Sequence, residues 1–425
     1  MGTYKRFRSL CPYLSILYLL QSLASPAAAR HVSEITLHSF CDQRHCEDGS
    51  HPNALAVGRD GAIYGATNGP YQGVGGAVFR LTNDGNGWRY SELFNFKGQK
   101  FSIPWGGLII DTAGNLYGVS SDAKHKAVVY KLTPGPEGMP WIPTVLYRFC
   151  SKKPGCADGD MPTGLAYHGQ SEGLPYDGQS PLFGTTPGGG LNGSGTAFEL
   201  VFDQRKQRWK EDVIFNFGFN AGETPAPYGV LAIDKNGNLF GTTAEGGAYS
   251  NGAAFQLAKV NGVWTETVLH NFCSPNDCLD GLEPLTHMIL DREGNLFGAS
   301  LGGTSSTGQG VLFKIVPSGI NSAFYVLHDF CVVDDCADGN IPTGALSLDH
   351  EGAVVGTTGD GGTSREGVAF RWKDKYQKVY DFCSQQDCLD GRDPGWGVIQ
   401  GPGKALLGTT SEGGTTDAGT VFELE

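Results

Sequence analysis

Five Asp-Gly pairs recur in this sequence, and each begins two residues after the second cysteine of a closely spaced cysteine pair. Carboxylates repeated on one face of a protein can bind Ca2+ or sugar hydroxyl groups. The same recurrence is expected if each aspartate accepts hydrogen bonds within its own turn and braces the neighbouring loop, and we favour this structural interpretation. The candidate ligand-binding aspartates are Asp48, Asp158, Asp280, Asp338 and Asp390.

A second set of candidates lies in the repeat that departs most from the others. There a polar run replaces a glycine-rich loop and brings together Asp122, Lys124, His125 and Lys126. In an enzyme that acts on polysaccharide, Asp122 and His125 would be the catalytic acid and base, and a lysine would neutralise a uronate carboxylate. Trp105, on the same rim, would stack against a sugar. Drift of one degenerate repeat explains these residues as well, and we favour that explanation.

Three histidines, His38, His270 and His328, resemble a metal-binding or catalytic set until the repeats are aligned. A position that alternates histidine with phenylalanine and tyrosine requires a flat ring, so we interpret these histidines as packing residues. The other repeats carry these rings at the same position: Phe94, Tyr147, Phe215 and Tyr380.

Ten of the eleven cysteines form local pairs, and Cys11 stands apart near the N-terminus. In an exported chain, this even and local pairing predicts disulfides that each close a small loop. A zinc site would need thiolates to converge, but these pairs belong to different repeats and lack the spacing of zinc knuckles. The predicted bonds are Cys41–Cys46, Cys150–Cys156, Cys273–Cys278, Cys331–Cys336 and Cys383–Cys388.

These residues are positioned by a repeat with a period near fifty, which indicates a repeat architecture. The most regular copy predicts four strands, at 228–234, 239–243, 253–257 and 264–272, with an Asn-Gly hairpin between the first two. Four strands make one blade, and seven copies predict an all-β, seven-bladed β-propeller. The repeat is marked by seven phenylalanines: Phe40, Phe96, Phe149, Phe217, Phe272, Phe330 and Phe382.

The two ends of the repeat array complement each other. The last copy ends with its third strand at 420–424, and the array begins with a fourth strand at 35–40. If this N-terminal strand completes the last blade, the ring closes and leaves no large sheet edge exposed. We therefore expect residues 30–425 to form a single propeller domain, with the cysteine loops and the Gly-Gly loops on one rim.

The segments 237–247 and 408–424 resemble the GloVer tandem repeat of exported bacterial proteins, through the sequences Gly-Asn-Leu-Phe-Gly-Thr-Thr and Gly-Thr-Thr-Ser-Glu-Gly-Gly. The resemblance covers nearly the whole chain after residue 29. It implies export and a β-rich repeat array, and it brings no assigned reaction.

Residues 1–29 read as a signal peptide, with a basic start, an apolar stretch over 10–23 and a small-residue cleavage site at 26–29. Its removal takes away three cations and moves the formal net charge from -13 to -16. Such a chain repels phosphate backbones and anionic lipid, so we expect no nucleic-acid partner. No segment after residue 29 reaches the roughly 20 apolar residues that a bilayer requires, so we expect no membrane insertion. We expect a monomer that is secreted or periplasmic.

Propellers support binding and catalysis on the same frame, so the fold alone does not decide the function. We favour an exported noncatalytic binding or scaffold protein that recognises a glycan or an extracellular protein on the cysteine-loop rim, without a cofactor unless Ca2+ binds there. The alternative is a polysaccharide lyase or hydrolase with its site near blade two. No nucleophile elbow, which would place Gly-x-Ser-x-Gly between a strand and a helix, and no His-Glu-x-x-His zinc helix is visible. An insertion in blade three, 167–181, is expected to be a polar surface loop on the opposite rim.

Overall fold

The computed structural model describes residues 32–43, 46–69, 75–97, 103–121, 127–136, 139–218, 226–273, 278–302 and 309–425. The expected signal peptide at 1–29 lies outside these residues. Residues Ser33–Glu425 form one compact unit. No helix within the described ranges is long and apolar enough to cross a membrane.

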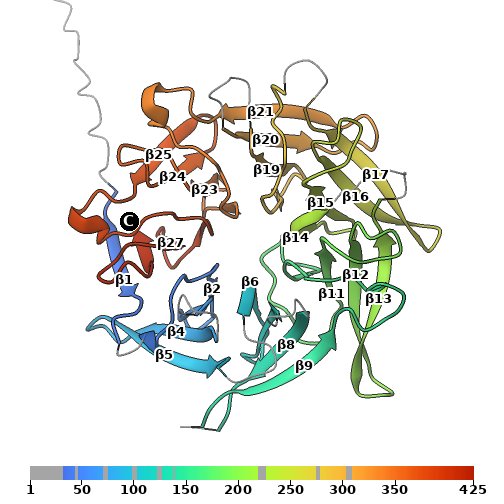
Figure 1. Ribbon diagram of the computed structural model, residues 1–425, viewed down its shortest axis with the longest axis horizontal. Coiled ribbons are helices and arrows are strands. Elements are labelled where there is room, and N and C mark those ends of the chain that lie inside the picture. The colour runs from blue at the N-terminus through green and yellow to red at the C-terminus, as the bar shows by residue number, and fades with distance from the viewer. Residues whose placement is uncertain are drawn as a thin grey trace, which may run out of the picture. The chain divides into compact units, whose positions relative to one another are not determined.

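Seven four-stranded antiparallel sheets stand around a central axis in a ring, as the sequence predicts (Figure 1). Blades one to three are β2 (Ala56–Val57), β3 (Ile63–Thr67), β4 (Ala77–Asn83), β5 (Trp88–Asn95); β6 (Ile103–Ile110), β7 (Leu116–Ser121), β8 (Ala127–Thr133), β9 (Ile142–Arg148); and β10 (Ala166–Tyr167), β11 (Leu182–Thr186), β12 (Thr196–Asp203), β13 (Arg208–Asn216). Blades four and five are β14 (Pro227–Ile233), β15 (Leu239–Thr243), β16 (Ala253–Val260), β17 (Val263–Asn271); and β18 (Ile289–Leu290), β19 (Leu296–Ser300), β20 (Val311–Val316), β21 (Ala323–Asp329). Blades six and seven are β22 (Ser347–Leu348), β23 (Val354–Thr358), β24 (Val368–Trp372), β25 (Tyr376–Asp381); and β26 (Val398–Gln400), β27 (Leu406–Thr410), β28 (Thr420–Leu424), β1 (Glu34–Ser39). The short 3-10 turns η2 (Asp334–Cys336) and η3 (Gln386–Cys388) lie in cysteine loops within the described residues.

The N-terminal strand closes the ring, which confirms the predicted pairing. β1 is the fourth strand of blade seven and runs antiparallel to β28, with Glu34 opposite Leu424 and Ser39 opposite Thr420. Beyond the strands, Ser33 and Glu425 exchange two backbone hydrogen bonds of 3.0 Å. Both edges of the array are therefore paired within one sheet.

The repeated phenylalanines lie between the blades. Each follows a fourth strand, is at most 2% exposed and packs on an aromatic ring in the third strand of the next blade, with centroids 4.8–5.5 Å apart. Burying such a side chain contributes about 1.5–3 kcal/mol. The pairs are Phe40–Phe79, Phe96–Tyr130, Phe149–Phe198, Phe217–Phe255, Phe272–Phe313, Phe330–Phe370 and Phe382–Phe422.

The Gly-Thr-Thr sequence at the end of the second strands also has a structural role. Its first threonine reaches the next blade, as where Thr409 donates to the carbonyl of Asn53 (3.2 Å). Its second threonine accepts the first amide of the third strand, as where the Thr420 amide donates to Thr410 (3.0 Å). The motif thus joins strands and blades through buried hydroxyl groups.

The blade-three insertion differs from the expected polar surface loop. Tyr176 is only 1% exposed, and its carbonyl accepts the amide of Thr112 from the β6–β7 turn of blade two (2.9 Å). Its ring packs edge-on against Tyr117, with centroids 5.1 Å apart. The insertion is therefore docked on blade two because it carries an aromatic anchor among its polar residues.

Candidate functional site

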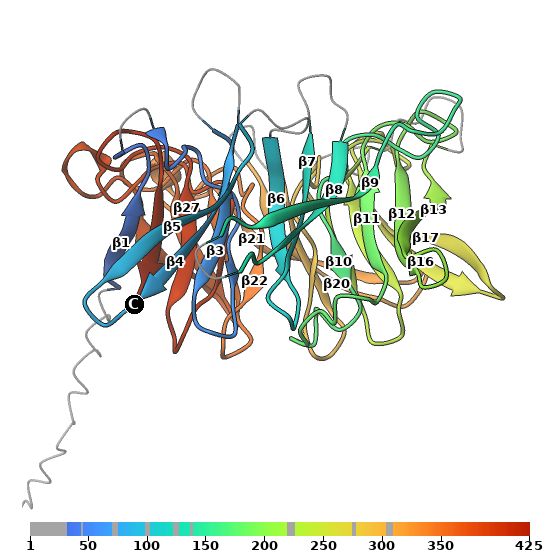
Figure 2. The ribbon, with the colours of Figure 1, turned by 90° about the horizontal axis from the view of Figure 1, so that it is seen from below.

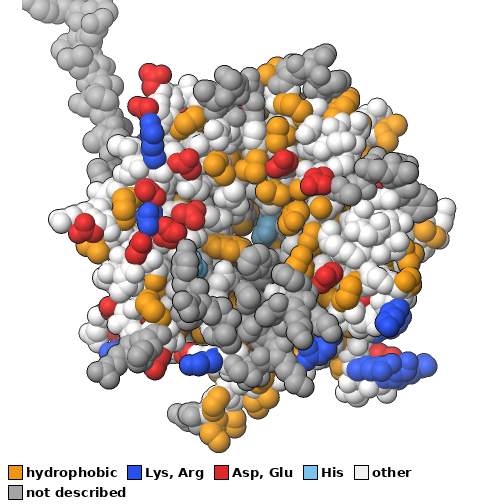
Figure 3. Space-filling model, in the orientation of Figure 1, with side chains coloured by type: hydrophobic (Ala, Val, Ile, Leu, Met, Phe, Trp, Pro, Cys, Tyr) orange, Lys and Arg blue, Asp and Glu red, His pale blue; other side chains and the backbone are white. Residues whose placement is uncertain are grey.

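The cysteine loops and the glycine-rich loops share one face of the ring, along the upper edge in Figure 2. We call it the Cys-loop face. Backbone bridges tie the two kinds of loop together, as between Asn340 and Asp360 and between Arg392 and Glu412. Figure 3 views this face and shows apolar side chains gathered around its centre.

All five predicted disulfides are present. Each closes a loop with a separation of five or six residues. All ten cysteines have a positive φ, between 45° and 61°, which side chains other than glycine rarely adopt. These loops are therefore held in one unusual backbone conformation in every blade that carries them.

The five Asp-Gly aspartates lie behind these loops with their side chains at most 16% exposed. At Asp158, one of three that are fully buried, the carboxylate accepts the amides of Ser151 (2.9 Å) and Lys152 (3.0 Å). Burial raises the pKa of Asp158, but these hydrogen bonds outweigh it and the pKa is lowered. A ligand could reach such a carboxylate only if the loop opened.

The ring position and the aspartate are partners, a link that the sequence interpretation missed. The ring tip bonds the carboxylate in all five cases, at 2.7–3.1 Å. The histidines also stack on the next blade, as His270 does on Phe324 with centroids 3.8 Å apart. A spacing of ten or eleven residues could have revealed the pairs, which are His38–Asp48, Tyr147–Asp158, His270–Asp280, His328–Asp338 and Tyr380–Asp390.

The two remaining ring positions support this partnership. They hold Phe94 and Phe215, and the segments that follow these residues carry neither a cysteine pair nor the associated Asp-Gly. A ring with a polar tip thus occurs where a carboxylate is present to receive it. Histidine and tyrosine suit this position because each has a flat face that packs and a polar atom that bonds the aspartate.

The backbone bridge between the cysteine loop and the glycine-rich loop recurs, but the side chains of the two bridging residues differ from blade to blade. The bridging pair is apolar in blade five (Leu282 and Leu301), a hydrogen-bonded amide and carboxylate in blade six (Asn340 and Asp360, 3.0 Å) and an ion pair in blade seven (Arg392 and Glu412, 2.9 Å). The Cys-loop face therefore presents different chemistry on the same scaffold.

A pocket of about 490 Å³ opens on the Cys-loop face at blade six, between the Cys331–Cys336 loop and the loop around Asp360. We call it the Cys331 pocket. Val332 and Val333 are 58% and 50% exposed beside it. Its acceptors include Asp335, which pairs with Arg365 at 3.0 Å, and the carboxylate of Asp360. Apolar surface beside a few polar groups is the usual composition of a ligand site.

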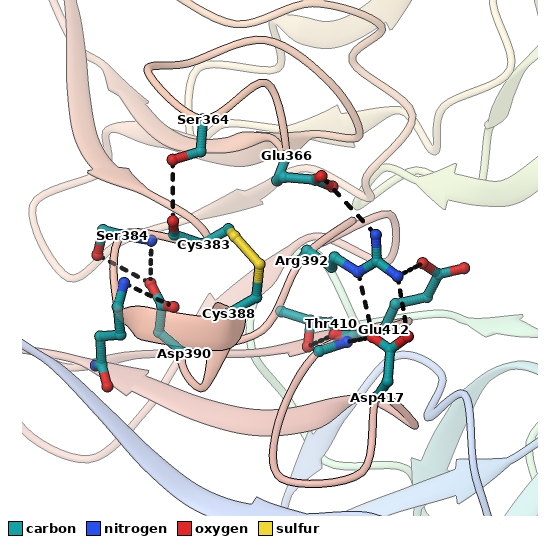
Figure 4. Close-up of a disulfide and its surroundings, with 12 residues drawn as sticks. Ser364, Glu366, Cys383, Ser384, Cys388, Asp390, Arg392, Thr410, Glu412 and Asp417 are labelled. Carbon is teal, nitrogen blue, oxygen red and sulfur yellow. Dashed lines mark hydrogen bonds and ion pairs between the residues drawn. A yellow bond between two sulfur atoms is a disulfide. The ribbon is translucent and has the colours of Figure 1, made fainter.

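A charged cluster lies at blade seven, around Arg392 (Figure 4). The guanidinium group bonds Asp417 through two nitrogens, at 3.2 and 3.0 Å, and Glu412 at 2.9 Å, and it lies 3.8 Å from Glu366 of blade six. Burial raises the pKa of Asp417, but the hydrogen bonds from Arg392 bring it below its ordinary value. Arg392 thus holds the acids of two blades together.

Asp393, next to this arginine, has the opposite electrostatic character. Its φ is 52°, and its amide donates to Glu366 of the preceding blade (3.1 Å). Burial and the charge of Glu412 raise the pKa of Asp393, although a hydrogen bond from Ser411 opposes them. A carboxyl group with a raised pKa beside ionised carboxylates is the combination used for general acid catalysis.

His287 is a further candidate that the sequence analysis did not identify. It precedes the buried Met288 of blade five, at a position where the other blades have small or aliphatic residues. A Cβ on Gly229 of blade four would lie 3.2 Å from its Cδ2. The ring makes no hydrogen bond within the described part of the chain, and burial lowers its pKa to about 4. The corresponding residues are Ala54, Gly107, Gly164, Val230, Ala345 and Gly397.

The predicted blade-two residues Asp122, Lys124, His125 and Lys126 lie outside the described residues. The backbone of Trp105 pairs with Val119 in the sheet, and its side chain is not described. Over the described ranges, no group of three or more His, Cys, Asp or Glu side chains is arranged to hold a metal ion. Binding of Ca2+ at the aspartates stays a prediction. Calorimetric titration of the protein with calcium would test it.

Comparison with known protein families agrees with the repeat. A family model described as the Gloeobacter/Verrucomicrobia repeat matches residues 170–422, which confirms the resemblance seen in the sequence. No curated protein matches this chain by sequence.

Several solved structures resemble the chain at low sequence identity. An α-L-arabinanase of Penicillium chrysogenum is 14% identical, with coverage of 76% of this chain and 92% of that one and a TM-score of 0.44. A protein of unknown function from Dyadobacter fermentans is 12% identical, with coverage of 93% and 100% and a TM-score of 0.46. PorZ, a surface component of the type-IX secretion system of Porphyromonas gingivalis, is 12% identical, with coverage of 87% and 46% and a TM-score of 0.49.

Proposed function

The chain belongs to the Gloeobacter/Verrucomicrobia repeat family, and we propose that it is an exported noncatalytic protein that binds a glycan. Its Cys-loop face is braced by disulfides and carries different side chains on a constant backbone frame. The observation that carries this proposal is the change of the bridging pair from Leu282–Leu301 to Asn340–Asp360 to Arg392–Glu412. A rigid frame lowers the entropic cost of binding, while variable side chains supply specificity.

The Cys331 pocket is the proposed glycan site. Sugar hydroxyl groups would donate to the carboxylates of Asp334, Asp335 and Asp360, and Val332 and Val333 would contact the apolar face of a sugar ring. Arg365, paired with Asp335, is 70% exposed and is free to move when a ligand enters. Export is supported by the five disulfides, which persist outside reducing compartments.

A glycan array probed with the purified mature chain tests this function, followed by calorimetry on each hit. Asp335→Asn should weaken binding at least tenfold. Asp387→Asn is the matched control, because Asp387 has the same left-handed conformation in the blade-seven loop, with φ of 57° against 58°. Equal effects of the two variants would show that the glycan does not bind in the Cys331 pocket. An array with no hits, together with capture of an extracellular protein, would replace the glycan by a protein ligand.

The second candidate function is hydrolysis or lysis of an extracellular polysaccharide. The raised pKa of Asp393 beside Glu412 favours blade seven as the place for such chemistry. Incubation with a polysaccharide panel, read out by reducing ends and unsaturated uronate, tests it. Activity that Asp393→Asn abolishes would support blade seven, whereas activity lost in an Asp122→Asn, His125→Ala variant would support the blade-two alternative. A chain that binds but never cleaves remains a binding protein.

A further inference from the structure

A second hollow, of about 400 Å³, lies on the face opposite the Cys-loop face. It is bounded by β2 of blade one, β6 of blade two and the blade-three insertion. Three blades thus contribute unlike residues to one place. We call it the insertion pocket.

The wall that the insertion supplies is fixed in position. Tyr176 is held by its backbone bond to Thr112 and by its contact with Tyr117. Within the insertion, the hydroxyl of Tyr167 donates to the carbonyl of Leu174 (2.8 Å). Leu174, a lining residue, is nevertheless 57% exposed. The pocket is therefore preformed and keeps an uncovered apolar lip.

The wall of the pocket is mixed, with slightly more polar than apolar surface, and its apolar part includes Val57, Leu108, Ile110 and Pro175. A preformed cavity of this size falls within the range of small-molecule sites, which span about 300–1,000 Å³ and combine apolar walls with polar groups. Its walls would receive the apolar body of a small ligand.

Two charged residues line the pocket, and they differ in availability. The Asp111 carboxylate is already occupied: it accepts the amides of Ala113 and Asn115 (2.9 and 2.8 Å), the Asn115 amide group (2.6 Å) and the Tyr117 hydroxyl (2.9 Å). Arg59 is exposed and makes no ion pair with the described part of the chain. Its neighbour Asp60 does not neutralise it, because Asp60 pairs with Arg80 at 2.6 Å.

From this geometry we propose that the insertion pocket binds a small molecule with an apolar body and one carboxylate group. The guanidinium of Arg59 offers two parallel donors that match a carboxylate. The site is independent of the proposed glycan site, which lies on the other face. Its ligand would be an aliphatic or aromatic monocarboxylate.

Calorimetry with octanoate, octylamine and octanol on the whole mature chain tests the proposal. Octanoate should bind at one site, octanol at least tenfold more weakly, and octylamine not at all. Arg59→Gln should weaken octanoate at least tenfold, and Leu174→Ala threefold or more, with melting temperatures close to that of the parent chain. Arg205→Gln, an exposed arginine on the β12–β13 turn, is the matched control and should leave octanoate binding unchanged. Binding of octylamine as tight as that of octanoate, or equal effects of Arg59→Gln and Arg205→Gln, would overturn the proposal, as would no octanoate binding.

Discussion

The Nε2 of His270 lies 2.7 Å from the Oδ2 of Asp280, and the same imidazole stacks on Phe324 of the next blade. One side chain thereby connects a cysteine loop to the interface between two blades. The equivalent position elsewhere holds Tyr147 and Tyr380, which bond their aspartates through a hydroxyl group.

Exchange at position 270 should separate the two roles of this ring. His270→Tyr keeps the flat ring and a polar tip, so we expect less than about 1 kcal/mol of lost stability. His270→Phe keeps the ring but leaves the Asp280 carboxylate short of a partner, which costs about 1–3 kcal/mol. Urea unfolding at neutral pH measures both. Equal losses for the two variants would mean that packing alone matters.

Asp280, behind the Cys273–Cys278 loop, should contribute to the acid sensitivity of the fold. Hydrogen bonds from His270 and from backbone amides lower the pKa of Asp280 although burial opposes them. A folded pKa below the unfolded value of about 3.9 stabilises the protein above that pH, and the contribution is lost as the pH falls through the folded pKa. Asp280→Asn should therefore be less stable than the parent at pH 6 and close the gap toward pH 2.5. Urea midpoints across this range check it; a gap that stays constant would contradict the linkage.

Ring closure should depend on Phe40, the buried residue that follows β1. Phe40 is fully buried against Phe79 of blade one, and Phe40→Ala should cost about 3–5 kcal/mol. Ile35 lies within β1 itself but is 43% exposed, so Ile35→Ala should cost less than about 1 kcal/mol. Urea unfolding compares them, with light scattering to detect association through an opened β28 edge. Equal costs would argue against closure by β1.

The disulfides should act locally. A loop of about six residues gives about 2 kcal/mol of unfolded-state entropy in the chain model. A Cys383→Ser, Cys388→Ser variant should lose about that much stability and should expose the Ser384 amide, which donates to Asp390 (2.8 Å), to faster hydrogen exchange. Protection in blade three should remain unchanged. Loss of protection around the whole ring would show that the bridge stabilises more than its own loop.

The repeat could be predicted from the sequence because its signals are local and recur seven times. Alignment of the copies shows the Phe40 column, the turn that includes the Asn-Gly hairpin at 236–237, and the missing fourth strand of the last copy. Tyr176 and His287 could not be placed in this way. Tyr176 packs on Tyr117, far away in sequence, and His287 adjoins β18, a strand of two residues with too little regularity to align.

His287 should make the fold sensitive to mild acid, and the sign of this effect follows from its surroundings. Burial lowers its pKa from 6.5 to about 4. Between pH 6.5 and pH 4 the imidazole is therefore protonated in the unfolded chain and neutral in the folded chain. Stability from this group is therefore complete above about pH 6.5 and falls as the pH drops toward 4. The contribution is at most about 3 kcal/mol, since one pKa unit corresponds to about 1.4 kcal/mol and the ring retains contact with water. His287→Gln removes the titrating group, so the parent should lose more stability than the variant between pH 7 and pH 4.5. Parallel urea midpoints over this interval, or an imidazole that titrates near pH 6.5 by NMR, would contradict a lowered pKa for His287 in the folded chain.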